Sequence, residues 1–319
     1  MRIDVIVNTT ARHYRARPSA VESVRRACER RAELSVTRTL DDLTRACEAI
    51  ASRGTDLVVL SGGDGTYMAG VTALARSLGE DRLPPIALMP GGTVATVARN
   101  WGMKGDPLVL LEELLAKRRE PPSTVRPTLR VRGVTREATS EERIGFMFGS
   151  GLVANFFDVY YAEGAGGYPG AARIVARIFA ESFVGGRYAR RVLDPLACTI
   201  EVDGRPLLPK AWSLICASVV RNLGIHMLVT YRAGEDLRRP HLVCSQLSSA
   251  QLGPRLPLVL AGKSIGGADH FDDLVSEFTV RFDPDGPYVL DGDMLRAREV
   301  IVSAGPAIRV VDLRRSDPR

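Results

Sequence analysis

The chain has 319 residues, of which 45% are hydrophobic and 25% charged, and its formal net charge is +6. These values are ordinary for a globular protein, and the length favours two domains over one. No apolar run approaches the length needed to cross a bilayer, so we expect a soluble protein without membrane-spanning segments.

The positive net charge does not identify a partner. The 43 basic residues are scattered and interleaved with 37 acidic ones, so we expect no nucleic acid to bind. The five cysteines are odd in number and form no Cys-x-x-Cys pair, which indicates reduced thiols. The N-terminal apolar run has no cleavage site after it and reads as a strand, so we expect a cytoplasmic location.

The first third of the chain alternates strand-like apolar runs with amphipathic helical stretches. The expected strands are 3–7, 34–37, 57–60 and 86–89, and the expected helices are 19–33, 40–51, 67–78 and 94–99. This alternation predicts an α/β domain with a parallel sheet. Ligands of such domains bind beyond the carboxyl ends of the strands.

The pattern changes after a helix expected over 107–118, where Glu-Pro-Pro-Ser at 120–123 interrupts it. We therefore expect a nucleotide-binding domain at 1–122 and a second domain at 123–299, and we allow the tail 300–319 to return to the first. Short strands with turn signals predict an antiparallel β-sandwich in the second domain. These strands are expected at 129–131, 146–148, 197–202, 212–220, 242–246, 278–282 and 288–290.

One helix, expected over 170–183, interrupts this β-rich half. Arg173 and Arg177 lie one turn apart on it, and apolar surface is supplied by Ile174, Ile178, Phe179 and Phe183. Two interpretations remain open: the helix contacts lipid, or it covers one end of the sandwich.

A glycine-rich segment follows the expected strand 57–60 and opens a helix. Its residues are Gly62, Gly63, Asp64, Gly65 and Thr66. Glycines let backbone N–H groups approach oxyanions, and the helix N-terminus adds its positive dipole end, so this segment predicts phosphate binding. A carboxylate beside polyphosphate is explained if Asp64 binds Mg²⁺ or orients a water or hydroxyl. As a strand-end carboxylate, Asp64 is expected to be exposed.

A second turn of this type follows the strand 86–89. It consists of Pro90, Gly91, Gly92 and Thr93. Two such turns one βαβ step apart favour a nucleotide. Asn8, at the end of the first strand, is expected to complete the pocket.

Two carboxylates separated by one glycine, Asp291-Gly292-Asp293, follow the strand 288–290 near the C-terminus. From local sequence alone this is a hairpin turn, because Asp-Gly is a strong hairpin signal.

Together, the two glycine-rich turns, Ala98-Arg99, the β-rich second half and the late Asp-Gly-Asp resemble the diacylglycerol kinase catalytic family. That family includes bacterial lipid kinases and sphingosine kinases. The resemblance implies a three-layer α/β domain of the NAD kinase and phosphofructokinase type, followed by an antiparallel β-sandwich. It also implies ATP and Mg²⁺ as cofactors and transfer of the γ-phosphoryl group to a lipid hydroxyl.

Carried over to this chain, the resemblance assigns catalytic roles to Asp64 and Asp293. Asp293 would be the base that deprotonates the acceptor hydroxyl, and Asp64 would bind the metal. ATP would contact Asn8 and segment 62–66, with Gly92 and Thr93 from the second turn. The resemblance further implies a lipid substrate, such as diacylglycerol or a sphingoid base, and peripheral membrane contact. A homodimer is also compatible with the sequence.

The chain departs from the family pattern at four places, one of which is the segment 124–127 after the domain hinge, where an acidic residue of the family is absent. Asp293 stands where the family usually has Glu, and Thr93 is followed by Val94, Ala95 and Thr96 where Asn and Asp are common. The segment 233–237, Ala-Gly-Glu-Asp-Leu, matches the family's Asp-Gly-x-Leu-Asp metal loop only weakly. These departures leave open a nucleotide- or lipid-binding regulator without turnover.

Two further alternatives come from other motifs. The first motif and the βα plan also resemble NAD kinases, although their Gly-Ser-Thr-Ala-Tyr-like segment is missing. Segment 262–266, Gly-Lys-Ser-Ile-Gly, fits a hydrolase nucleophile elbow after an expected strand at 256–260. We discount a hydrolase, because the only acid between Ser264 and His270 is Asp269, too close in sequence to orient the histidine.

Overall fold

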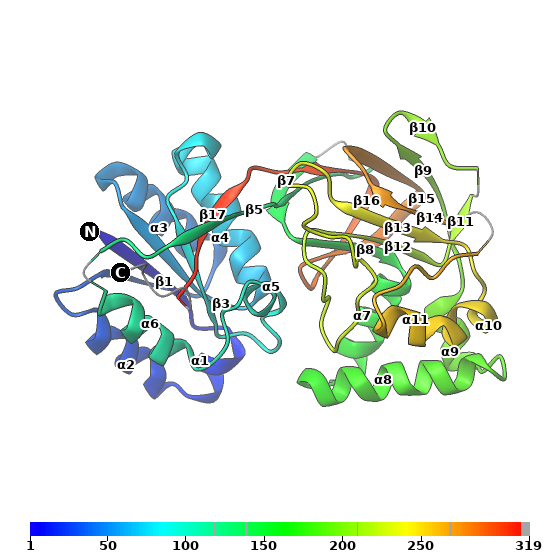
Figure 1. The fold of residues 1–319 in the computed structure, drawn as a ribbon, viewed down its shortest axis with the longest axis horizontal. Helices are drawn as coiled ribbons and strands as arrows, with labels where there is room; N and C mark the ends of the chain where they lie inside the picture. The colour runs from blue at the N-terminus through cyan, green and yellow to red at the C-terminus, as the bar shows by residue number, and fades with distance from the viewer. Residues whose placement is uncertain (118, 138–139, 209, 268–269, 314–319) are drawn as a thin grey trace. The chain divides into compact units, whose positions relative to one another are not determined.

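The computed structural model describes residues 1–117, 119–137, 140–208, 210–267 and 270–313 (Figure 1). The chain forms two compact units, the first comprising Met1–Arg126 with Pro306–Arg319 and the second Pro127–Gly305. Strand β5 (Ser123–Arg126) belongs to the first unit because it pairs with the returning strand β17 (Ile308–Val311). Residues 314–319 of the expected returning tail lie outside the described residues.

The first unit contains a sheet of six strands in the order β2-β1-β3-β4-β17-β5. The four N-terminal strands are parallel: β1 (Ile3–Asn8), β2 (Glu33–Thr37), β3 (Leu57–Gly62) and β4 (Ile86–Pro90). β17 adds a parallel strand beside β4, and β5 pairs antiparallel at the edge. The side chains of β3 are fully buried from Leu57 to Leu60, as expected of a strand covered on both faces.

The helices of this unit lie on both sides of the sheet, which confirms the predicted three-layer α/β domain (Figure 1). They are α1 (Arg12–Ala16), α2 (Ser19–Cys28), α3 (Leu40–Arg53), α4 (Asp64–Leu78), η1 (Glu80–Arg82), α5 (Thr96–Asn100) and α6 (Pro107–Leu115). The start of α3 is fixed by a reciprocal cap. Thr39 Oγ1 accepts from Asp42 N at 3.1 Å, and Asp42 Oδ2 accepts from Thr39 N at 3.0 Å.

The second unit contains an antiparallel sheet that follows the path β14-β13-β12-β8-β15-β16-β6-β7, with β9 joining β15. Its strands are β6 (Leu129–Val134), β7 (Ser140–Gly145), β8 (Met147–Gly151), β9 (Leu196–Val202), β10 (Arg205–Pro206), β11 (Ala211–Trp212), β12 (Leu214–Ser218), β13 (His241–Ser245), β14 (Phe271–Leu274), β15 (Glu277–Leu290) and β16 (Asp293–Ala304).

Strand β15 turns this sheet into the predicted sandwich. The register of its pairing with β16 shifts between Arg281 and Gly286, so its first half pairs with β9 and its second half with β8. Phe148 of β8 packs its ring 5.5 Å from that of Phe278 and 5.8 Å from that of Tyr288, which lie in the two halves of β15. The two parts of the sheet therefore share an aromatic core.

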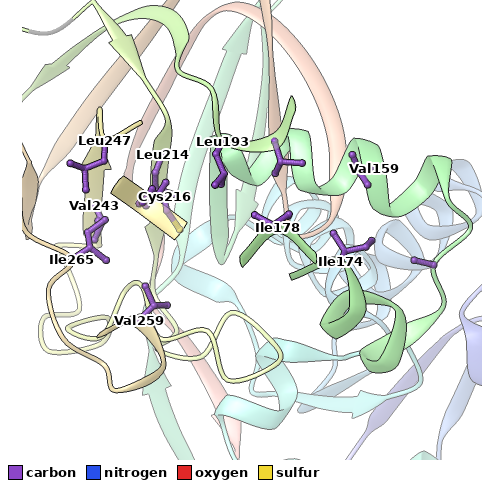
Figure 2. Packing of buried hydrophobic residues seen from close by; sticks show 13 residues of the cluster. Val159, Ile174, Ile178, Leu193, Leu214, Cys216, Val243, Leu247, Val259 and Ile265 are labelled. Carbon is purple, nitrogen blue, oxygen red and sulfur yellow. The ribbon is translucent and has the colours of Figure 1, made fainter. Parts of the chain in front are cut away.

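Helices cover one end of this sheet. They are α7 (Leu152–Ala162), α8 (Gly167–Ser182), α9 (Arg187–Leu193), α10 (Ser249–Leu252), η2 (Gly253–Arg255) and α11 (Leu256–Leu260). An apolar cluster joins α7, α8 and α9 to β12 and β13, as Figure 2 shows. The strand expected at 256–260 is wrong, because this short apolar run is helix α11. Within the described ranges, no helix has the length and apolar character needed to span a membrane.

We expect Phe148→Ala to destabilise the chain by about 3–5 kcal/mol, because the substitution empties the aromatic core on both halves of β15. Urea unfolding followed by circular dichroism measures the effect. Leu208→Ala is the control, since Leu208 is 88% exposed and should change stability by less than about 0.5 kcal/mol. A similar small change for both variants would contradict the assigned core.

Candidate phosphate-binding site

The first glycine-rich segment lies where β3 ends and α4 begins. Gly62 is the last residue of β3, Gly63 is the N-cap and Asp64 opens the helix. A Cβ on Gly62 would lie 2.3 Å from Thr66 Oγ1, so the turn closes only without a side chain at that position. The segment thus presents the N-terminus of α4 at the carboxyl edge of the sheet, which suits an anion.

The second turn touches the first. Gly91 N donates to Gly62 O at 2.8 Å. A Cβ on Gly92 would lie only 2.4 Å from the Gly63 Cα, so the two backbones meet without room for a side chain. The structure therefore brings together the two turns that the sequence singled out.

Side chains of β1 and α4 tie the ends of three strands together. Asn8 Nδ2 donates to Thr66 Oγ1 at 2.9 Å, which places the end of β1 beside the first turn. The fully buried Tyr67 lies with its hydroxyl 3.0 Å from Gly62 O and 2.9 Å from Met89 O, linking the ends of β3 and β4. Tyr67 gives no functional signal in the sequence, because the spacing of a tyrosine on the apolar face of a helix is the same as that of an ordinary core residue.

Backbone donors remain available beside this contact. Gly92 and Thr93 lie outside any helix or strand, and their N–H groups find no acceptor within the described part of the chain. The N–H groups of Gly65 and Thr66 lie in the first turn of α4, at the helix N-terminus next to this contact. Unpaired amides of this kind suit phosphate oxygens, and the side chain of Thr93 is exposed beside them.

Asp64 is not the freely exposed strand-end carboxylate that the sequence suggested. Its Oδ2 accepts from Thr96 N at 2.8 Å and its Oδ1 from Val97 N at 2.9 Å, so it caps the N-terminus of α5. Burial raises the pKa of this carboxyl, while these N–H donors and the charge of Arg99 oppose the rise. Asp64 thereby joins the first turn to the segment after the second.

At the two turns, Asp64 offers a carboxylate to a magnesium ion. One carboxylate suits an ion that binds together with the nucleotide better than an ion that the chain binds alone. No three His, Cys, Asp or Glu side chains cluster among the described residues. In segment 233–237, the weak match to the metal loop, Glu235 pairs with Arg232, and Asp236 Oδ1 accepts from Arg238 N. Asp64 keeps lone pairs beyond its two backbone bonds, and Mg²⁺ commonly takes one carboxylate, phosphates and water.

The two carboxylates of the late motif have different surroundings. Asp291 and Gly292 have φ of +50° and +93°, which makes the β15–β16 turn the hairpin expected from local sequence. Asp291 is buried, and its carboxylate accepts from Phe146 N and Met147 N, both at 3.0 Å. Asp291 is therefore structural, and the side chain of Asp293 is the one that reaches solvent.

Asp293 belongs to the second unit, whereas the two turns belong to the first. The protein atoms around the Asp293 carboxylate raise its pKa, and the positive charge of Arg143 opposes the rise. Tyr161 of helix α7 contacts the same hairpin, where its hydroxyl donates to Gly292 O at 2.8 Å. A partly desolvated carboxylate of this kind is suited to accept a proton.

The segment once compared with a hydrolase elbow does not form a triad. Asp269 lies outside the described residues, and the acid that contacts His270 is Asp272, at 3.3 Å. Ser264 Oγ lies 3.2 Å from the same ring nitrogen, Nε2. A triad needs its serine and its acid on opposite ring nitrogens, so this geometry agrees with discounting a hydrolase.

Comparisons with known proteins agree with this geometry. Residues 2–126 match the model of the diacylglycerol kinase catalytic domain. A diacylglycerol kinase from Bacillus anthracis str. Sterne has a similar structure, with a TM-score of 0.62, 15% identity and coverage of 97% of this chain and 96% of that chain. A proposed diacylglycerol kinase from the same organism has a TM-score of 0.67, with the same identity and coverage.

A likeness to an NAD kinase from Archaeoglobus fulgidus in complex with ATP has 13% identity, covers 98% of this chain and 94% of that chain, and has a TM-score of 0.47, too low to carry an argument. No curated protein matches the sequence. Residues 2–126 therefore resemble the diacylglycerol kinase catalytic domain, and the chain as a whole has the fold of the bacterial structures.

We expect Gly92→Ala to weaken nucleotide binding by at least about tenfold, because the new methyl group would overlap the Gly63 Cα and separate the two turns. Titration with a fluorescent ATP analogue measures the affinity. Gly166→Ala is the matched control, since a Cβ there meets no atom within 4 Å. Unchanged affinity in Gly92→Ala would contradict a site at this contact.

We expect Asp64→Asn to destabilise the fold by about 1–3 kcal/mol, because the new amide nitrogen would face one of the two N–H groups that the carboxylate now accepts. Turnover should be lost as well. Urea unfolding measures the first effect, and Asp81→Asn, in the exposed turn η1, is the control. Wild-type stability in Asp64→Asn would show that the capping contacts contribute nothing.

Proposed function

We propose that this protein is an ATP-dependent kinase that transfers the γ-phosphoryl group to the hydroxyl of a lipid such as diacylglycerol or a sphingoid base. The observation that carries the proposal is the contact between the two glycine turns, which leaves the amides of Gly92 and Thr93 unpaired at a helix N-terminus. The resemblance of residues 2–126 to the diacylglycerol kinase catalytic domain supports a kinase over other phosphate-binding proteins.

In the proposed reaction, the amides of Gly92 and Thr93 and the N-terminus of α4 hold the phosphate oxygens. Asp64 fixes α5 and offers its remaining lone pairs to Mg²⁺, which would neutralise charge on the phosphates. The acceptor hydroxyl oxygen forms a bond to the γ-phosphorus, the bond to the bridging oxygen breaks, and ADP leaves. Asp293 accepts the hydroxyl proton.

Incubation of the full chain with Mg²⁺, γ-labelled ATP and a panel of lipids in mixed micelles tests this function. A labelled diacylglycerol or sphingoid product is expected. Retained ATP binding without any labelled lipid would overturn the lipid-kinase proposal in favour of a nucleotide-binding regulator, an alternative that Ala95, Thr96 and Asp293 motivate. Labelled NADP⁺ formed from NAD⁺ would support the NAD kinase alternative.

We expect Asp293→Asn to reduce kcat by roughly 10²–10⁴-fold, because the amide cannot accept the hydroxyl proton. The KM for ATP should change by less than about twofold, since a base contributes to the transition state and not to nucleotide binding. Steady-state kinetics at saturating lipid separates the two constants. An equal loss of ATP affinity would contradict the role of a base.

The raised pKa of Asp293 predicts how activity depends on pH. The base acts when deprotonated, so kcat/KM should fall as the pH drops through this pKa, at higher pH than for an ordinary carboxyl. Arg143→Gln removes the charge that opposes the rise and should move this acid limb to still higher pH. Arg130→Gln, on the neighbouring strand β6, should not. Identical profiles for all three proteins would contradict the assignment.

A further inference from the structure

Helix α8 has one buried face and one face in solvent. Ile174 and Ile178 are 1% and 8% exposed, and Figure 2 shows both among the buried cluster of the second unit. On the other side, exposed positions recur three and four residues apart, as on one face of a helix. These positions are Pro169, Ala172, Arg173, Ala176, Arg177 and Ala180.

The composition of this outer face is unusual for a helix in water. A water-facing helix surface normally carries mixed charges and polar groups. Here the exposed positions hold proline, alanine and arginine only, and the polar Glu181 and Ser182 are half-buried and buried. The half-buried Val175 and Phe179 extend the apolar surface. Arg173 and Arg177 on this face pair with Glu163 and Glu181 at 3.9 and 2.9 Å, so the face is mainly apolar and its positive charges are compensated.

The apolar surface continues past the end of the helix. Phe183 and Val184 are 60% and 81% exposed, and the ring of Phe183 lies 5.0 Å from that of Phe179. A short turn leads into α9, where Arg187 and Arg190 are exposed and have no acidic partner within the described residues. An exposed apolar tip beside uncompensated cations is the pattern of a helix that lies in a lipid interface.

We propose that the outer face of α8, with its tip Phe183–Val184 and the arginines of α9, docks on a lipid bilayer that bears anionic headgroups. Charge complementarity favours this occupant: Arg187 and Arg190 of α9 are exposed beside the apolar tip, and guanidinium groups pair with phosphate. Both interpretations of this helix then hold, because its inner face covers the sheet and its outer face meets lipid. The proposal rests on the proposed function only in that a lipid acceptor resides in a membrane.

Vesicle flotation without ATP tests the docking surface. The full chain should bind vesicles of phosphatidylglycerol and phosphatidylcholine. Added salt should weaken this binding, and binding to pure phosphatidylcholine vesicles should be weaker. Phe183→Asp combined with Val184→Asp should lower the partition coefficient by at least about tenfold. Arg187→Glu combined with Arg190→Glu should reduce binding to the anionic vesicles only. Leu208→Asp, an equally exposed apolar site of the same unit, should bind like wild type.

Each outcome separates this inference from the proposed function. Undiminished vesicle binding in the Phe183/Val184 variant, or an equal loss in Leu208→Asp, would overturn the inference. A wild-type dimer that this variant converts to a monomer, with no vesicle binding by either, would assign α8 to a second copy instead. The Phe183/Val184 variant should phosphorylate a soluble short-chain diacylglycerol as fast as wild type. If wild type does not phosphorylate this substrate either, the proposed function fails, and the vesicle-binding results still test the docking surface.

Discussion

The backbones of Gly63 and Gly92 meet in the first unit without a side chain between them, and the candidate site depends on this contact. Parallel pairing of β3 with β4 brings both turns to the same edge of the sheet. The bond from Gly91 N to Gly62 O holds them at that edge. Because the contact is made by backbone alone, the amides next to it stay open to an anion, which a side chain would have covered.

Around this contact the chain adds side chains whose role is mainly to position the turns. Tyr67 lies between the carbonyls that end β3 and β4, and Asn8 bonds Thr66 from β1. Asp64 extends the same network to α5, whose first N–H groups it accepts. A residue that serves both as a helix cap and as a candidate metal ligand couples the geometry of the phosphate turns to the stability of the unit.

The second unit separates structural from chemical roles in a similar way. Asp291 uses its carboxylate to hold the start of β8, and this fixes the hairpin that carries Asp293 into solvent. Helix α8 divides its two faces between the apolar cluster and the surface. In both cases one residue or face holds the fold together, and the neighbouring residue or face is exposed to solvent, where it can contact a ligand or a membrane.

The sequence by itself determined the alternating α/β domain, the two turns and the antiparallel second half, because strand and helix periodicities and glycine positions are local signals. It could not place the short run 256–260, which is apolar in either conformation and is helix α11. It allowed the tail to return to the first domain but could not place β17 beside β4, and it did not show that Asp64 caps α5. Those features depend on contacts between residues distant in sequence, and only the tertiary structure decides which distant backbone groups meet.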